Sequence, residues 1–143
     1  MMQNRQQAAQ VLAWAGVVPF AALALISTFA TPAWLSDLLL GYALLILAFM
    51  CGSLWTGALA RTDATSAPLF ASNALVLAAL PALLVPLAWA AAWMAVLFAL
   101  HALAEWRWVY HGQPGWYRRL RVAVSLAVVS LLVLAALIGF SSA

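Results

Sequence analysis

The apolar stretches of this sequence constrain its fold more than any other feature. Residues 11–30, 38–59 and 120–140 each form a run of about 20 mostly apolar positions, the length that a helix needs to cross a hydrocarbon core about 30 Å thick. Residues 69–104 form a longer run, and one helix over that run would be about 54 Å long. Because this exceeds the thickness of the membrane, the run must fold back and supply two spans.

Two prolines in the longer run mark candidate positions for that turn. A turn near Pro86 leaves about 17 residues before it and about 18 after it, whereas a turn at Pro81 leaves a first half that is too short to span. We therefore expect the turn at residues 86–88 and a kink at Pro81. The predicted fold is a compact bundle of five transmembrane helices in a single domain over residues 1–143, with spans at about residues 11–30, 38–59, 69–85, 88–105 and 120–140.

The composition is that of an all-α integral membrane protein. Hydrophobic residues make up 69% of the chain and charged residues 6%, whereas soluble proteins have about 45–50% and about 25%. The basic residues flank apolar runs and form no solvated basic segment, so we do not expect nucleic acid as a partner. The single cysteine, Cys51, excludes a disulfide or a multi-thiolate metal site within one chain.

The six basic residues are all arginines, and the five-span model places them on one side of the membrane. With the N-terminus inside, five of them fall in the inner segments 1–10, 60–68 and 106–119, and Arg121 lies just inside the last span. Positive charge collects on the cytoplasmic side of membrane proteins. The sequence therefore predicts a cytoplasmic N-terminus and an external C-terminus. The absence of lysine from an alanine- and leucine-rich chain favours a bacterial inner membrane.

His101 and Glu105 are the ionisable pair of the fourth predicted span. They are four residues apart, so they share one face of the helix, and ionisable groups inside a membrane often mark ion, proton or ligand sites. Two interpretations remain open. In the first, Glu105 ends the span at the headgroups and His101 hydrogen-bonds to it or to a neighbouring helix. In the second, the two residues form a ligand or proton site near the cytoplasmic face.

We predict no catalytic, cofactor-binding or metal-binding residues. The other histidine, His111, lies in the loop after the fourth span, and with His101 and Glu105 it fits no standard metal or haem spacing. Cysteine catalysis requires a base beside the nucleophile, and no such signature surrounds Cys51. We therefore expect neither enzymatic activity nor a cofactor.

Arginines gather on both sides of the last predicted loop. Arg118, Arg119 and Arg121 follow a Pro-Gly pair at the start of the last span. Anionic lipids attract each arginine near the membrane surface by about 1 kcal/mol, and helix N-termini also favour phosphate. We expect Arg107, Arg118, Arg119 and Arg121 to contact anionic lipid headgroups. Docking of an acidic partner is the alternative.

The second predicted span contains two pairs of small residues at a spacing of four. These pairs are Gly52 with Thr56 and Ser53 with Gly57. Such a spacing lets helix backbones approach closely in lipid, where packing drives helix association. We expect these residues to form a helix-packing seam inside the bundle, and an interface with a partner protein is the alternative.

Four segments of the chain resemble one known family when they are taken together and in order. These segments are GVVPF, YALLILAFMCGSLWTG, LPALL and PGWYRRLRVAVSL. They resemble the domain of unknown function 3429 family, which consists of small multi-span membrane proteins of bacteria with mitochondrial relatives. The chain has Cys51 and Gly52 where the family typically has paired glycines, and Glu105 where an aspartate is usual. The resemblance implies a membrane fold and no particular activity.

Two functions fit this sequence. The first is an accessory, assembly or structural subunit of a larger membrane complex, such as a respiratory or photosynthetic one, because the loops are short and small residues are abundant. The second is a small transporter or a ligand- or quinone-binding protein that uses His101 and Glu105. The expected partners are the lipid bilayer with its anionic lipids and, for the first function, another membrane protein.

Overall fold

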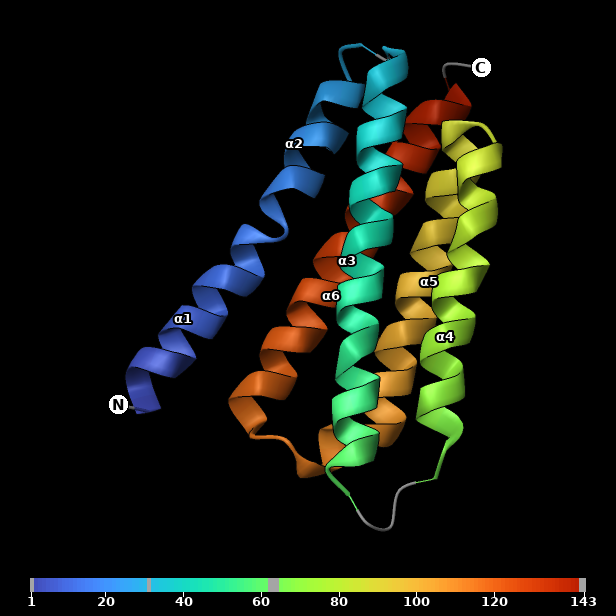
Figure 1. The fold of residues 1–143 in the computed structure, drawn as a ribbon. Helices are drawn as coiled ribbons and strands as arrows, with labels where there is room; N and C mark the ends of the chain where they lie inside the picture. Colours follow the sequence, from blue (N-terminus) through green and yellow to red (C-terminus); the bar gives the residue numbers. More distant parts are fainter. Residues whose placement is uncertain (1, 31, 62–64, 142–143) are drawn as a thin grey trace.

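The computed structural model describes residues 2–30, 32–61 and 65–141 (Figure 1). These residues form helices and contain no strand, which confirms the all-α prediction for the described part of the chain. The elements are α1 (Met2–Ala15), α2 (Val18–Ser27), α3 (Ala33–Leu59), α4 (Ala67–Ala79), the 3-10 helix η1 (Leu80–Leu84), α5 (Leu87–Trp108), the short 3-10 helix η2 (Tyr110–Gly112) and α6 (Gly115–Ser141).

Five helical segments in the described residues are long and apolar enough to cross a membrane, which is the predicted number. They are Asn4–Ser27, Ala33–Leu59, Ala67–Leu84, Leu87–Trp108 and Gly115–Ser141. The first segment begins well before residue 11, and the last begins before residue 120. This difference has a physical reason, because apolar runs measure the hydrocarbon core, whereas helices also continue through the headgroup regions of a bilayer about 40–45 Å thick.

Every proline lies at the start of a helix or close to a break in one. Pro19, Pro68 and Pro81 lie in the first turns of α2, α4 and η1, Pro32 and Pro86 cap α3 and α5, and Pro114 precedes α6. Proline fits these positions because its missing N–H group would have no intrahelical partner there. The predicted turn in the longest apolar run lies at Val85 and Pro86. Pro81 converts the end of that helix into a 3-10 turn.

The first span is broken between α1 and α2. The α-helical pattern stops at Gly16 and Val17, three residues or fewer before Pro19. The carbonyl of Gly16 accepts a hydrogen bond from the Tyr42 hydroxyl of α3, over 2.8 Å. This bond satisfies a backbone group at the break and ties the break to the bundle. Beyond it, α1 diverges from the bundle towards the N-terminus (Figure 1).

The core lies around α5, which packs against α6, α3 and α4. Half of the membrane-spanning window of α5 is buried, compared with 17% of the first span. Phe20 of α2 and Phe98 of α5 are both completely buried, and their rings meet edge to face with centroids 6.0 Å apart. Large apolar side chains such as Phe49 and Leu77 are exposed instead. An apolar exterior of this kind is stable only in an apolar solvent, which agrees with the five apolar helices.

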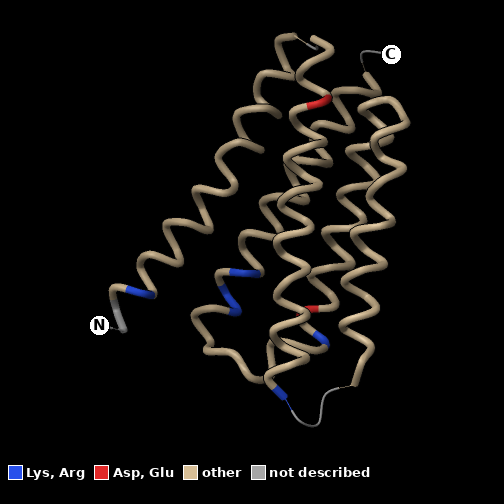
Figure 2. The backbone as a smooth tube through the Cα atoms, viewed as in Figure 1, with Lys and Arg blue, Asp and Glu red and all other residues tan. Residues whose placement is uncertain are grey.

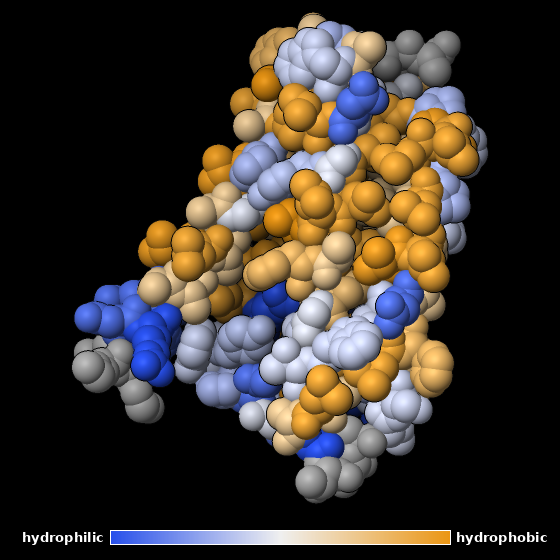
Figure 3. Space-filling view, viewed as in Figure 1, coloured by the Kyte–Doolittle hydropathy of each residue, from blue (hydrophilic) through white to orange (hydrophobic). Residues whose placement is uncertain are grey.

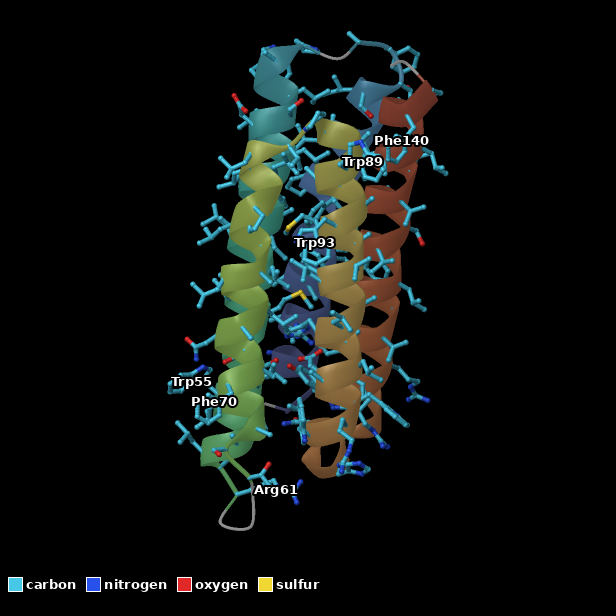
Figure 4. All side chains as sticks on the ribbon, turned by 90° about the vertical axis from the view of Figure 1, so that its right-hand side faces the viewer. Trp55, Arg61, Phe70, Trp89, Trp93 and Phe140 are labelled. Atoms are coloured by element: carbon cyan, nitrogen blue, oxygen red, sulfur yellow. The ribbon has the colours of Figure 1, made fainter. Side chains whose placement is uncertain are left out.

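Charged residues are distributed unequally between the two ends of the bundle. The arginines lie towards the end that holds the α3–α4 and α5–α6 connections (Figure 2), and Asp37 lies in the second turn of α3, which begins at the opposite end (Figure 1). Figure 4 shows Trp55, Arg61 and Phe70 at the arginine end and Trp89 and Phe140 at the other. Glu105 is the exception, because this acid lies in the last turn of α5, next to the α5–α6 connection.

Candidate functional site

Glu105 is the centre of a polar cluster between α3, α5 and α6. Its side chain is completely buried, and both of its carboxylate oxygens bind Arg121 of α6. Arg121 Nε donates to Oε2 over 3.1 Å, and Nη2 donates to Oε1. The Ser53 hydroxyl of α3 lies 2.5 Å from Oε1. Forked, charge-assisted hydrogen bonds of this kind are strong, and here one carboxylate joins three helices.

The periodicity of α6 explains why Arg121 points into the bundle. Its neighbours on the same face, Val124, Val128 and Leu132, are all buried, so Arg121 occupies the next position of an inward stripe. It lies about 9 Å beyond the first residue of α6, and its side chain is only 13% exposed. Burial of an ion costs several kcal/mol, and pairing with Glu105 offsets this cost. The two charges together sum to zero.

His101 lies one turn before Glu105 on α5 and is also completely buried. Its Nδ1 is 3.9 Å from Glu105 Oε2, which is beyond hydrogen-bond distance. Neither ring nitrogen has a hydrogen-bond partner among the described residues, although the Met50 carbonyl is near the ring. An unpaired buried polar group costs about 1–3 kcal/mol. His101 is therefore the least satisfied side chain of the cluster.

Tyr110 of η2 adds a hydroxyl close to the same cluster. Burial and, to a smaller extent, the negative charge of Glu105 raise the pKa of this hydroxyl, so Tyr110 stays protonated at physiological pH. The hydroxyl groups of Tyr110 and Ser125 are buried and have no hydrogen-bond partner among the residues that the structure describes. Arg121, Ser53 and Tyr110 thus place several hydrogen-bond donors around a single carboxylate.

A groove of about 320 Å³ lies between α1, α3 and α6, and Arg121 forms part of its wall. The groove exists because α1 diverges from the bundle and leaves parts of α3 and α6 uncovered (Figure 1). Figure 3 shows this face hollowed, with a hydrophilic patch inside the hollow. We call it the Arg121 groove, and its lining residues are Ala9, Leu12, Ala13, Gly16, Val17, Ile46, Phe49, Met50, Tyr117, Leu120, Arg121, Val124 and Val128. Its walls are apolar except at Tyr117 and Arg121.

A model of the family described as "Protein of unknown function (DUF3429)" matches residues 5–137. The chain belongs to this family. The matched range contains every residue of the polar cluster and of the Arg121 groove, so both features lie within the family domain. The match also confirms the resemblance carried by the four sequence segments. No curated protein and no solved structure matches the chain.

The structure of this DUF3429 protein corrects the expected setting of the ionisable residues. Glu105 does not end its span at the headgroups, because α5 continues to Trp108 and the carboxylate is buried. His101 does not hydrogen-bond to Glu105. Arg121 was expected at the headgroups and lies inside the bundle instead, because the buried carboxylate compensates its charge. Arg107, Arg118 and Arg119 are exposed, and their contact with anionic headgroups stays a prediction.

The two pairs of small residues in α3 face different surroundings. Ser53 belongs to the polar cluster, and a side chain at Gly57 would come within 2.9 Å of Val109. Gly52 and Thr56 are exposed, and a side chain at Gly52 would meet nothing within 4 Å. The expected seam inside the bundle is therefore wrong for Gly52 and Thr56. Gly52 and Thr56 lie about 100° around the helix from Ser53 and Gly57, and this rotation turns them away from the bundle.

A second apolar groove, of about 580 Å³, lies on the outer side of α4 and α5. On its α4 side the lining includes the small side chains Ala71, Ala74 and Ala78, whereas leucines and tryptophans line most of its α5 side. Trp93 of α5 borders this α4–α5 groove, and its indole N–H donates to the Ala78 carbonyl over 2.7 Å. Arg107 and Trp106 lie at the arginine end of the groove, which is otherwise almost wholly apolar.

The remaining candidate ligands for a metal do not come together. No three histidine, cysteine or acidic side chains converge on one point within the described residues. Cys51 is buried in the apolar core, and His111 is exposed and lines a different pocket, with Arg61 and Arg107, at the arginine end.

Proposed function

We propose that this DUF3429 protein binds a small amphiphilic molecule of the membrane in the Arg121 groove, without catalysing a reaction. One observation carries the proposal: a groove with apolar walls contains a guanidinium group that a buried carboxylate holds in place. Ligand sites in proteins are typically apolar hollows with a few fixed polar groups. The apolar part of the ligand would lie against α3 and α6, and its polar part would meet Arg121 and Tyr117.

The hydrogen bonds that Glu105 already accepts favour ligand binding over proton-coupled transport as the function. Its two oxygens already accept hydrogen bonds from Arg121 and Ser53, so a change of protonation would break the contacts that join three helices. A transport residue has to exchange partners during the cycle. Glu105 positions Arg121 in this proposal. His101 does not line the groove, so it makes no direct contact with the ligand.

A second candidate function is the accessory or assembly subunit that the sequence suggests. The α4–α5 groove favours it, because the groove is almost wholly apolar and the alanines on its α4 side would admit a helix of a partner membrane protein at close range. The two functions are compatible, because the α4–α5 groove and the Arg121 groove share no lining residue. In this second function the protein would attach to a larger membrane complex, such as a respiratory or photosynthetic one.

The membrane itself is part of the proposal. We place the protein in the inner membrane of a bacterium, with its N-terminus in the cytoplasm and its C-terminus outside. The collection of the arginines towards one end of the bundle supports this orientation (Figure 2). In this orientation the Arg121 groove lies in the cytoplasmic half of the bilayer, and Arg118 and Arg119 lie close to the anionic headgroups.

Replacement of either of two alanines on α1 by phenylalanine tests the binding function. Ala13 lines the Arg121 groove, whereas Ala8 is exposed on the same helix and does not line it. Ala13→Phe should fill the groove and displace the ligand, whereas Ala8→Phe should leave ligand binding unchanged. The measurement is mass spectrometry of amphiphiles that remain bound after extraction in a mild detergent.

The same preparation separates the two candidate functions. A bound amphiphile that is present in the wild type and in Ala8→Phe, and lost in Ala13→Phe, supports ligand binding. Retention of the same molecules by all three proteins would refute it. Co-purification of a stoichiometric larger complex supports the accessory function, and migration of the protein alone from native membranes counts against it.

A further inference from the structure

The net charge at the end of the Arg121 groove restricts the ligand that it can hold. Arg121 is the only charged residue among those that line the groove, and its positive charge is neutralised by Glu105 directly behind it. His101 lies 3.9 Å from the Glu105 carboxylate and does not line the groove. The polar end of the groove therefore presents hydrogen-bond donors and no net charge.

The hydrogen bonds of Arg121 leave one nitrogen for a ligand. Its bonds to Glu105 and Ser53 use Nε and Nη2, and Nη1 makes no hydrogen bond to any described residue. A guanidinium nitrogen can only donate, so the atom that it meets must be an acceptor. The Tyr117 hydroxyl, on the same wall of the groove one turn earlier in α6, can donate a second hydrogen bond.

An anionic headgroup fits these donors poorly. A phosphate that bound Arg121 would share the guanidinium with the Glu105 carboxylate, and the two negative charges would repel each other at close range with little water between them. Arg121 also lies about 9 Å beyond the start of α6, deeper than the exposed Arg118 and Arg119, which suit phosphates at the membrane surface. An uncharged carbonyl avoids the repulsion and can accept a hydrogen bond from either donor.

We infer that the ligand of the Arg121 groove is an uncharged amphiphile whose polar end carries carbonyl acceptors, as isoprenoid quinones do. This inference rests on the proposed binding function and adds the chemistry of the headgroup to it. Glu105 then determines the specificity of the groove, because its negative charge excludes anionic lipids from Arg121. The prediction that separates this role from a merely structural one is a change in ligand preference when that charge is removed.

The test compares decylubiquinone with phosphatidylglycerol on the purified full-length protein in detergent. Native mass spectrometry over a range of ligand concentrations gives their relative affinities. We expect the wild type to prefer decylubiquinone by about ten-fold or more, and Glu105→Gln to lose or reverse this preference, because Arg121 then carries an uncompensated charge. Glu105→Asp keeps the charge and should keep the preference.

A double variant keeps the inference testable if Glu105→Gln does not fold, as judged by its circular dichroism. The variant Glu105→Gln with Arg121→Gln removes both charges and leaves an amide donor in the groove, so it should still prefer the quinone. Equal or tighter binding of phosphatidylglycerol by the wild type would overturn the inference while leaving the proposed function intact. If Ala13→Phe weakens the binding of neither ligand, the proposed function fails with it.

Discussion

The ion pair between Glu105 and Arg121 predicts a large effect on stability when either partner is removed. Two opposite unit charges about 4 Å apart attract each other by about 4 kcal/mol at the effective dielectric constant of about 20 that suits protein sites. Methionine in place of Arg121 leaves Glu105 buried without this partner, and breaking such a pair costs about 3–5 kcal/mol. Leucine in place of Glu105 should lower the free energy of unfolding by a similar amount.

Removal of both partners should cost much less than removal of one. Apolar side chains of similar volume in place of a buried ion pair are often neutral, or stabilising by about 1–4 kcal/mol. The double variant Glu105→Leu with Arg121→Met should therefore be several kcal/mol more stable than the sum of the two single effects implies. The residues are in direct contact, which is the condition under which such effects do not add.

Reversible unfolding in mixed micelles measures this double-mutant cycle. Sodium dodecyl sulfate is titrated into the purified protein, and far-UV circular dichroism follows the loss of helix. Arg119→Met is the matched control, because Arg119 is two residues away on α6 and exposed, so its loss should leave the midpoint almost unchanged. Strictly additive effects of the two substitutions would refute the assignment of this pair as a coupled, buried contact.

Two further predictions concern helix packing. Gly57→Leu should destabilise the bundle by about 1–3 kcal/mol, because its side chain would overlap Val109, whereas Gly52→Leu should be tolerated, and equal midpoints in the same titration would contradict this. Tyr42→Phe removes the hydrogen bond to the Gly16 carbonyl, so it should speed amide hydrogen exchange around the break between α1 and α2 without changing exchange in α5. An unchanged exchange rate at the break would show that this bond does not hold it.

The number of spans could be predicted from the sequence because the thickness of a bilayer is fixed. A run of about 20 apolar residues is one crossing, and the run over residues 69–104 was too long for one. The prolines specified where helices start, since proline lacks the N–H group that a helix interior requires. These are local properties of the chain, and the structure follows them at Pro81 and Pro86.

The candidate site could be predicted only in part. His101 and Glu105 stood out because an ionisable residue in an apolar run is rare. Ser53 was assigned to helix packing and Arg121 to the headgroups, although one signal for Arg121 was present: it is in phase with Val124, Val128 and Leu132 on the inward face of α6. The pairing itself could not be read, because Glu105 and Arg121 lie on different helices, and only the packing of α5 against α6 brings the two side chains together.

The sequence by itself determined the solvent of this protein, the number of its apolar helices and the sign of the charge at one end. The first two depend on the free energy of transferring residues between water and lipid, and the third on where the arginines fall between the apolar segments, so all three are properties of single segments. Only the tertiary structure decided that a carboxylate, a guanidinium and a hydroxyl from three helices meet, and that α1 leaves a groove beside them. In lipid, helices associate through shape and hydrogen bonds, and these depend on which faces meet.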